Sequence, residues 1–142
     1  MSIFDGVASR CDKYQKIVVS SDSKSRCQHI LNNPDGKNSL RQYKLDEDIF
    51  PQRTCCDFLV LNDTLRNAYF IELKGRDFTH GIEQLRSAEN LLHSELSDYK
   101  KLFRLIHTRN LVHRLRTSKI NKIIASWHGN FVERTLRYEE EC

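Results

Sequence analysis

The chain contains no apolar run that approaches the roughly 18 residues a membrane-spanning helix requires. Its first six residues, Met1 to Gly6, include neither a basic cluster nor an apolar core, so we expect no signal peptide and a cytoplasmic location. With 142 residues, of which 39% are hydrophobic and 30% charged, the composition is that of a soluble globular protein. We expect a single domain over residues 1–142, with a core at 55–137 and an N-terminal region, 1–50, whose structure the pattern does not specify.

Paired cysteines at tight zinc-ligand spacing are also missing. The chain has five cysteines, an odd number, and no Cys-x-x-Cys pair, which favours reduced thiols over a disulfide framework. One alternative stays open at this point. Cys27 and His29 could join Cys55 and Cys56 as ligands of a structural zinc ion if the fold brought the two pairs together. The protein would then be a zinc-stabilised protein-interaction domain.

Acidic residues are nearly absent from the last third of the chain. Residues 100–137 hold ten basic residues and a single acid, Glu133, which gives this segment a net charge of +9. Such a surplus is typical of a surface that binds a polyanion; the alternative is a basic face that only contacts solvent. Hydroxyl residues lie beside cations where a helix is expected to begin, an arrangement suited to phosphate. The residues expected to contact nucleic acid are Arg109, Arg114, Arg116, Lys119 and Lys122.

The order of the expected elements is that of an α/β protein with a mixed central β-sheet flanked by helices. Two runs of β-branched, aromatic and aliphatic residues, 58–61 and 69–73, indicate strands. The amphipathic spacing after Thr79 indicates a helix that runs to about residue 97. Further expectations are strands at 40–45, 101–107 and 131–137, a helix at 118–128, one or two helical turns at 26–32, and a solvated acidic tail at 139–141.

Three charged residues interrupt the apolar strands. Asp57 precedes the first strand, and Glu72 and Lys74 lie two residues apart near the end of the second. Charged side chains are rarely placed inside a sheet unless they are paired or bind a metal, and residues two apart in a strand share a face. If the turn between the strands centres on residues 64–65, paired residue numbers sum to 129. Asp57 then lies opposite Glu72, one step from Lys74.

This arrangement suits metal-assisted hydrolysis of a phosphodiester. The charge of a phosphodiester repels nucleophiles, and Mg²⁺ (or Mn²⁺) held by oxygen ligands neutralises that charge and activates water. Asp57 and Glu72 are the expected carboxylate ligands, with the backbone carbonyl of Leu73 as a third. Lys74 would place a positive charge on the scissile phosphate or orient the attacking water. The plainer alternative is an ordinary ion pair between Glu72 and Lys74 on an edge strand.

Asp57, fourteen further residues and Glu72-Leu73-Lys74 resemble the motif of the PD-(D/E)xK nuclease superfamily, which includes restriction endonucleases, archaeal-type Holliday junction resolvases and phage exonucleases. The likeness covers roughly residues 55–110. Gln84, on the helix that follows, is similar to the glutamine that several branches carry after the lysine. The resemblance implies a restriction-endonuclease-like core in which Asp57 and Glu72 bind metal, Lys74 is catalytic, and Gln84 positions metal, water or phosphate.

The resemblance also implies an activity and partners. We expect an Mg²⁺-dependent endonuclease that acts on nucleic acid, with DNA favoured over RNA. Because the chain is barely longer than the catalytic core, its specificity would come from a protein partner, from dimerisation or from the structure of the substrate. Resolvase-like nucleases of this size are usually dimers, so we expect a homodimer.

Two positions depart from the family pattern. Cys56 stands where the family proline precedes the aspartate, and no residue is recognisable as the glutamate that many members carry on their first helix. The missing acid favours a competing hypothesis, a non-catalytic nuclease-fold module that binds nucleic acid or acts as an adaptor. The candidates for the third acid are Asp5, Asp12, Asp22 and Glu47.

Overall fold

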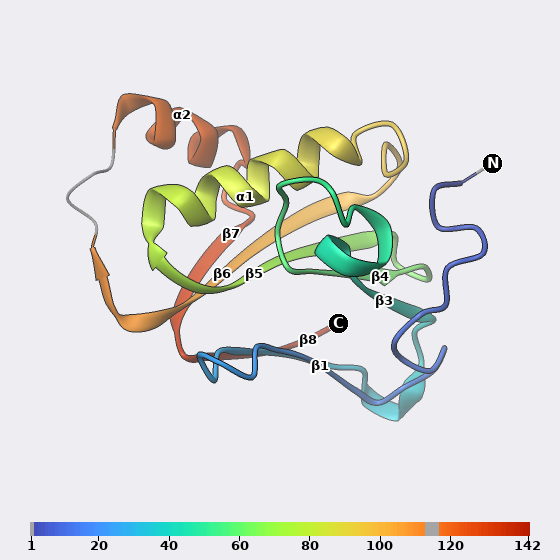
Figure 1. The fold of residues 1–142 in the computed structure, drawn as a ribbon. Helices are drawn as coiled ribbons and strands as arrows, with labels where there is room; N and C mark the ends of the chain where they lie inside the picture. Colours follow the sequence, from blue (N-terminus) through green and yellow to red (C-terminus); the bar gives the residue numbers. More distant parts are fainter. Residues whose placement is uncertain (1, 113–116) are drawn as a thin grey trace.

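The computed structural model describes residues 2–112 and 117–142, without the side chains at 74–76 and 109–112. The described residues form a mixed α/β fold of two mixed β-sheets and two α-helices, arranged in three layers (Figure 1). The helices α1 (Phe78–Leu91) and α2 (Ser118–Ser126) form the first layer. The five-stranded sheet in the middle consists of β3 (Leu40–Lys44), β4 (Phe58–Asn62), β5 (Asn67–Asp77), β6 (Lys100–Val112) and β7 (Phe131–Thr135). The three-stranded sheet consists of β1 (Ile17–Ser21), β2 (Gln28–Asn32) and β8 (Arg137–Glu141).

The five-stranded sheet combines an antiparallel meander with two parallel crossovers. Its strand order is β3-β4-β5-β6-β7; β3, β4 and β5 are antiparallel neighbours, whereas β5, β6 and β7 are parallel. The two parallel connections pass through α1 and α2, as such crossovers usually do. Two short helical segments, η1 (Pro34–Gly36) and η2 (Leu45–Ile49), flank β3.

The β4–β5 hairpin has the register predicted from the sequence. Phe58 pairs with Ile71 and Asn62 pairs with Asn67, so paired residue numbers sum to 129. The Asn62 side chain shapes the turn, because its Oδ1 accepts the N–H groups of Thr64 and Leu65 at 3.0 and 2.9 Å. Such local side-chain bonds are the reason that asparagine is common in turns.

Each face of the five-stranded sheet packs against a different layer. On one face, Leu59, Phe70 and Phe103 lie in a core shared with Ile82 of α1 and Ile120 of α2. The opposite face belongs to a second core, built between the two sheets from Phe58, Val60, Ile71, Val18 and Leu31. Because both faces are covered, every residue of β4 is buried, which explains why that strand is a continuous apolar run and does not alternate.

Three expectations about the elements need correction. The helices cover only one face of the five-stranded sheet, since the small sheet covers the other (Figure 1). Residues 26–32 do not form helical turns; they contain β2, whose two hydrogen-bonded neighbours β1 and β8 override a short segment's own preference. The acidic residues 139–141 are not a solvated tail but lie within β8.

An ion network holds β8 in place and uses one of the ten basic residues of segment 100–137. Arg104 is 6% exposed, and its Nε and Nη2 donate to the two carboxylate oxygens of Glu140 at 2.7 and 3.0 Å. His29 of β2 contacts the same carboxylate through Nε2 at 2.7 Å. Segment 100–137 is therefore not one continuous basic surface.

Within the described residues, no helix is long and apolar enough to cross a membrane.

Candidate active site

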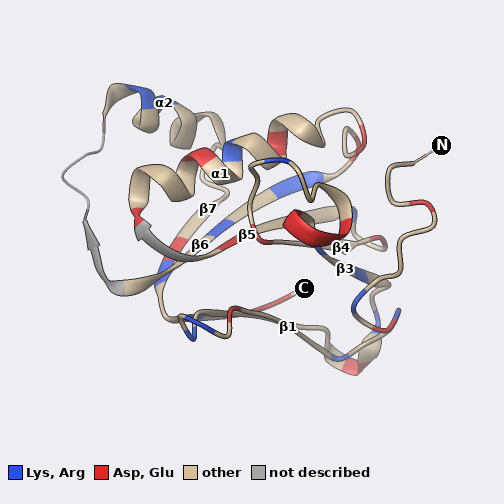
Figure 2. Ribbon diagram, viewed as in Figure 1, with Lys and Arg blue, Asp and Glu red and all other residues tan. Residues whose placement is uncertain are grey.

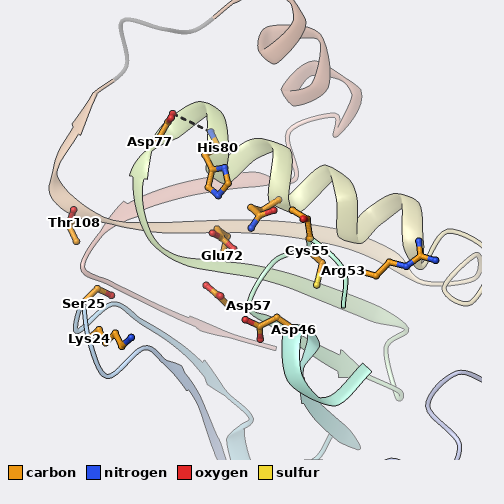
Figure 3. A pocket seen from close by; sticks show the side chains of 12 residues that line it. Lys24, Ser25, Asp46, Arg53, Cys55, Asp57, Glu72, Asp77, His80 and Thr108 are labelled. Carbon is orange, nitrogen blue, oxygen red and sulfur yellow. Dashed lines mark hydrogen bonds between the residues drawn. The ribbon is translucent and has the colours of Figure 1, made fainter. Parts of the chain in front are cut away.

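A cavity of about 900 Å³ opens where the meander, α1 and the β1–β2 loop meet (Figure 3). Its walls come from four segments of the chain that are far apart in sequence. Asp57 and Glu72 lie at its centre, between α1 and the loop that carries Lys24 (Figure 3). The lining residues are Lys24, Ser25, Asp46, Arg53, Thr54, Cys55, Asp57, Glu72, Asp77, His80, Gln84 and Thr108.

Asp57 is positioned by the hairpin itself. It directly precedes β4, and its Oδ2 accepts the backbone N–H of Leu73 at 2.8 Å. The side chain thus extends the β4–β5 ladder by one bond beyond Phe58. A carboxylate that accepts a backbone N–H is held in one orientation, so Asp57 is set toward the strand that carries Glu72.

Glu72 lies in β5 and shares the helix-side face of the sheet with Phe70, since residues two apart in a strand point the same way. It is only 6% exposed. The thiol of Cys55 lies on the wall of the same cavity. Burial, followed by the negative charges of Asp46, Glu72 and Asp57, raises the pKa of Cys55 to about 12. Three carboxylates therefore contribute negative charge to the part of the cavity wall where Cys55 lies.

Asp46 is the acid that the sequence analysis did not select. The first residue of η2, Leu45, donates its N–H to the carbonyl of Asp57 at 2.9 Å, which brings the acidic η2 turn over the start of β4 (Figure 2). The side chain of Asp46 lines the cavity and accepts a hydrogen bond from Lys44 Nζ at 3.1 Å. The sequence did contain a clue to Asp46. In an antiparallel meander, the residues that follow one strand lie beside the residues that precede the next.

The first turns of α1 form the opposite wall. Asp77 caps the helix by accepting the N–H of His80 at 3.2 Å, and His80 and Gln84 line the cavity. Gly81 allows α1 to approach the sheet closely, since a Cβ at this position would lie 2.8 Å from Leu105 Cδ1. The Oε1 of Gln84 is buried and has no hydrogen-bond partner among the described residues. It is therefore a polar atom available to a ligand in the cavity.

The structure brings together part of the set of predicted site residues. Asp57, Glu72 and Gln84 line the cavity, and Leu73 is joined to Asp57 by its N–H. The backbone of Lys74 continues β5, but its side chain lies outside the description. The side chain of Arg109 and the whole of Arg114 and Arg116 also lie outside it.

The two remaining predicted contacts to nucleic acid lie elsewhere. Lys119 and Lys122 belong to α2 and line a separate groove of about 330 Å³ together with Arg86 and Ser118. Lys119 Nζ lies 3.9 Å from the Glu83 carboxylate. These two lysines are therefore not part of the cavity around Asp57 and Glu72.

The zinc alternative does not fit the structure. Cys27 belongs to the core between the two sheets, whereas Cys55 and Cys56 belong to the core on the helix side. His29 contacts Glu140 in the small sheet. The two proposed ligand pairs thus lie on opposite faces of the five-stranded sheet.

Across residues 2–112 and 117–142, as far as their side chains are described, no three His, Cys, Asp or Glu side chains are grouped closely enough to hold a metal ion by themselves. The four earlier candidates for a third acid do not line the cavity; they are Asp5, Asp12, Asp22 and Glu47. The site that the structure presents is consequently the pair Asp57 and Glu72, with Asp46 lining the same cavity. This donor set is too small for an all-protein metal cage.

Comparison with known proteins finds no family model, no curated protein and no solved structure that matches the chain.

Proposed function

We propose that this protein is a metal-dependent nuclease that hydrolyses phosphodiester bonds of nucleic acid, with DNA as the favoured substrate. The observation that carries the proposal is the meeting of Asp57 and Glu72 in one cavity. The hairpin register brings the two carboxylates together from adjacent strands, and the Leu73 N–H holds Asp57 in place at 2.8 Å. Burial of carboxylates is energetically unfavourable, so several carboxylates gathered in one cavity are typical of a functional site.

The order of elements supports a restriction-endonuclease-like core. An antiparallel meander, β3-β4-β5, is followed by α1 and by β6, which is parallel to β5. Asp57 precedes β4 and Glu72 lies on β5, so the two acidic residues that resemble the PD-(D/E)xK motif come from neighbouring strands of this meander. The superfamily assignment itself is part of the proposal.

The residues of the cavity fit a hard divalent cation. Mg²⁺ keeps several waters and is commonly bound by one or two carboxylates together with substrate phosphate, so a pair of carboxylates is sufficient. Asp57 and Glu72 would hold Mg²⁺ or Mn²⁺, with the Leu73 carbonyl as a third oxygen donor. The bound ion would neutralise phosphate charge and lower the pKa of a coordinated water.

The protein's own residues would perform the remaining tasks. Gln84 Oε1, buried and without a partner in the described part of the chain, would orient a water or the phosphate from the helix side. Asp46, which lines the same cavity, would add negative charge that attracts a cation. Lys74, by its place in the motif, would stabilise the charge that develops on the scissile phosphate.

Incubation with DNA and RNA substrates tests the proposal. Single-stranded, duplex and branched DNA and single-stranded RNA are mixed with the protein and Mg²⁺ or Mn²⁺, and products are resolved on a gel. We expect metal-dependent cleavage that Lys74→Ala reduces at least about 100-fold, since loss of one preorganised charge-stabilising group commonly costs that much. Lys100→Ala is the matched control, because Lys100 begins β6 at the far end of the strand. Equal cleavage by both variants would contradict the assignment of Lys74.

A non-catalytic nucleic-acid-binding or adaptor module is the second candidate. The structure gives it one specific argument, because no three metal-binding side chains come together within the described residues. This candidate predicts salt-sensitive binding to nucleic acid and no cleavage with any divalent metal.

Sedimentation of the purified chain tests the associated proposal of a homodimer.

A further inference from the structure

The rim of the cavity carries positive charge on two sides of its acidic centre. Lys24 lies on the loop between β1 and β2, and Arg53 lies on the loop after η2; both line the cavity (Figure 3). Both residues are exposed. Neither has an ion-pair partner in the part of the chain that the structure describes. Two such cations on either side of a pair of carboxylates suit a polyanionic substrate. Its outer negative charges would contact the cations while a central one reaches the carboxylates.

The β1–β2 loop is held in a fixed shape by its own backbone. Asp22 N–H donates to the carbonyl of Cys27 at 3.1 Å, and Arg26 N–H donates to the carbonyl of Asp22 at 3.0 Å. Ser25 N–H donates to the Asp22 carboxylate at 3.2 Å. These bonds fix the position of Lys24 and Ser25 as a wall of the cavity. The loop belongs to the small sheet, so this wall is not part of the helix-side layer.

The size of the cavity limits what can reach its centre. A volume of about 900 Å³ lies in the range of pockets that enclose a small molecule, roughly 300–1,000 Å³. A duplex would have to bring its complementary strand into the same space, whereas a single strand would not. Glu72 is only 6% exposed, so the reacting phosphate has to descend between the walls.

We infer that the cavity binds a single DNA strand, with the phosphates on either side of the reacting one held by Lys24 on one wall and Arg53 on the other. Enzymes that enclose a target base in a pocket act on single strands or on nucleotides extruded from a duplex, and we apply the same steric reasoning to a phosphate that reacts inside a cavity. The Ser25 and Thr108 hydroxyls supply neutral hydrogen-bond donors on the same walls. This inference rests on the proposed nuclease function and narrows its substrate from nucleic acid to single-stranded DNA.

Binding measured without cleavage tests the inference. The Lys74→Ala protein in Mg²⁺ is titrated against a fluorescently labelled single strand and against the same sequence as a blunt duplex, and the anisotropy is followed. We expect the single strand to bind at least tenfold more tightly than the duplex, since tight apposition to the walls is possible only for the former. Equal or tighter binding of the duplex would overturn the inference.

A pair of matched lysine variants tests the role of the loop. In the same background, Lys24→Ala is expected to lower the slope of log affinity against log salt by about 0.7 for the single strand, the value of one phosphate contact. Lys37→Ala removes the same charge beyond the opposite end of β2, after η1, and is expected to leave the slope unchanged. Equal slopes for the two variants would overturn the role of Lys24.

The outcomes separate this inference from the proposed function. Metal-dependent cleavage of duplex and single-stranded DNA at equal rates by the unmodified protein would overturn the inference and leave the nuclease proposal standing. Failure to bind or cleave any nucleic acid would overturn both.

Discussion

The two faces of the five-stranded sheet each carry a cluster of charged side chains, and the clusters differ in what surrounds their carboxylates. On the small-sheet side, Glu140 is held by two bonds from Arg104 and one contact from His29, all between 2.7 and 3.0 Å. On the helix side, Glu72 shares a cavity with Asp57 and Asp46, and the rim cations Lys24 and Arg53 stand apart from the acids.

The difference shows in the pKa values. Burial acts to raise the pKa of Glu140, but the hydrogen bonds from His29 and Arg104 outweigh it and lower that pKa to about 2. On the helix side, burial and the charges of Asp46, Glu72 and Asp57 raise the pKa of Cys55 to about 12. One cluster is internally neutralised and serves stability, whereas the other concentrates negative charge beside an opening. A group of carboxylates that lines a cavity is thus a candidate for function, whereas a carboxylate tied into a network of hydrogen bonds serves the fold.

Substitution of Glu72 is expected to have the largest effect on activity. Glu72→Gln keeps the size and much of the polarity of the side chain but removes one of the two carboxylates. We expect at least about a 100-fold loss of cleavage, measured as initial rate at saturating Mg²⁺. The free energy of unfolding is expected to change by less than about 1 kcal/mol, because active-site charges are generally not optimised for stability. A large loss of stability would show that Glu72 belongs to a structural network like that of Glu140.

Substitution of Glu140 is expected to do the reverse. Glu140→Gln leaves Arg104 buried without its ionic partner, so we expect the free energy of unfolding at pH 7 to fall by about 2 kcal/mol, less than the full pKa difference implies because solvent reaches part of the carboxylate. Urea denaturation measures the change. Cleavage by the folded protein should be unaffected. A loss of activity without a loss of stability would contradict the division between the two faces.

Acid titration isolates the same group. Because the folded-state pKa of Glu140 lies at about 2, below its ordinary value of 4.5, its ionised form stabilises the fold above pH 4.5, and that contribution is lost as the pH falls toward 2. The unmodified protein is therefore expected to lose more stability than Glu140→Gln between pH 4.5 and 2.5. Parallel stability curves for the two proteins would show that the Arg104–Glu140 pair contributes nothing.

Substitution of Gln84 is expected to have the smallest effect. Gln84→Ala should reduce cleavage by about tenfold, which corresponds to the roughly 1.4 kcal/mol that one neutral hydrogen bond can contribute, and leave stability nearly unchanged, because the lost Oε1 has no partner in the described residues. Asn90→Ala is the control, since Asn90 is an exposed amide on the same helix. Equal activity of the two variants would remove Gln84 from the site.

The parts of the fold that the sequence predicted are those held by neighbours along the chain. The β4–β5 hairpin, its register and the meeting of Asp57 with Glu72 follow from two apolar runs and a short turn, because the side-chain period of a strand allows one register to bury both runs. The existence of α1 was also predicted, although its cap was placed at Thr79 and lies two residues earlier, at Asp77. Its end was placed too late, at about residue 97 instead of Leu91, because Leu92 and Leu96 are buried at helical spacing without continuing the helix.

The parts that only the tertiary structure decided depend on pairing between distant segments. Asp46 reaches the cavity because Leu45 bonds to Asp57, and Lys24 reaches it because β2 docks beside β8. The sequence pattern predicted a solvated tail at residues 139–141, and only the structure shows that Arg104 and His29 contact Glu140. The sequence alone therefore determined the paired carboxylates at the centre of the site. The walls of the cavity, the cations at its rim and the Arg104–Glu140–His29 network on the opposite face were decided by the packing of the layers. Contacts between segments so far apart in the chain produce no periodic sequence pattern from which they could be predicted.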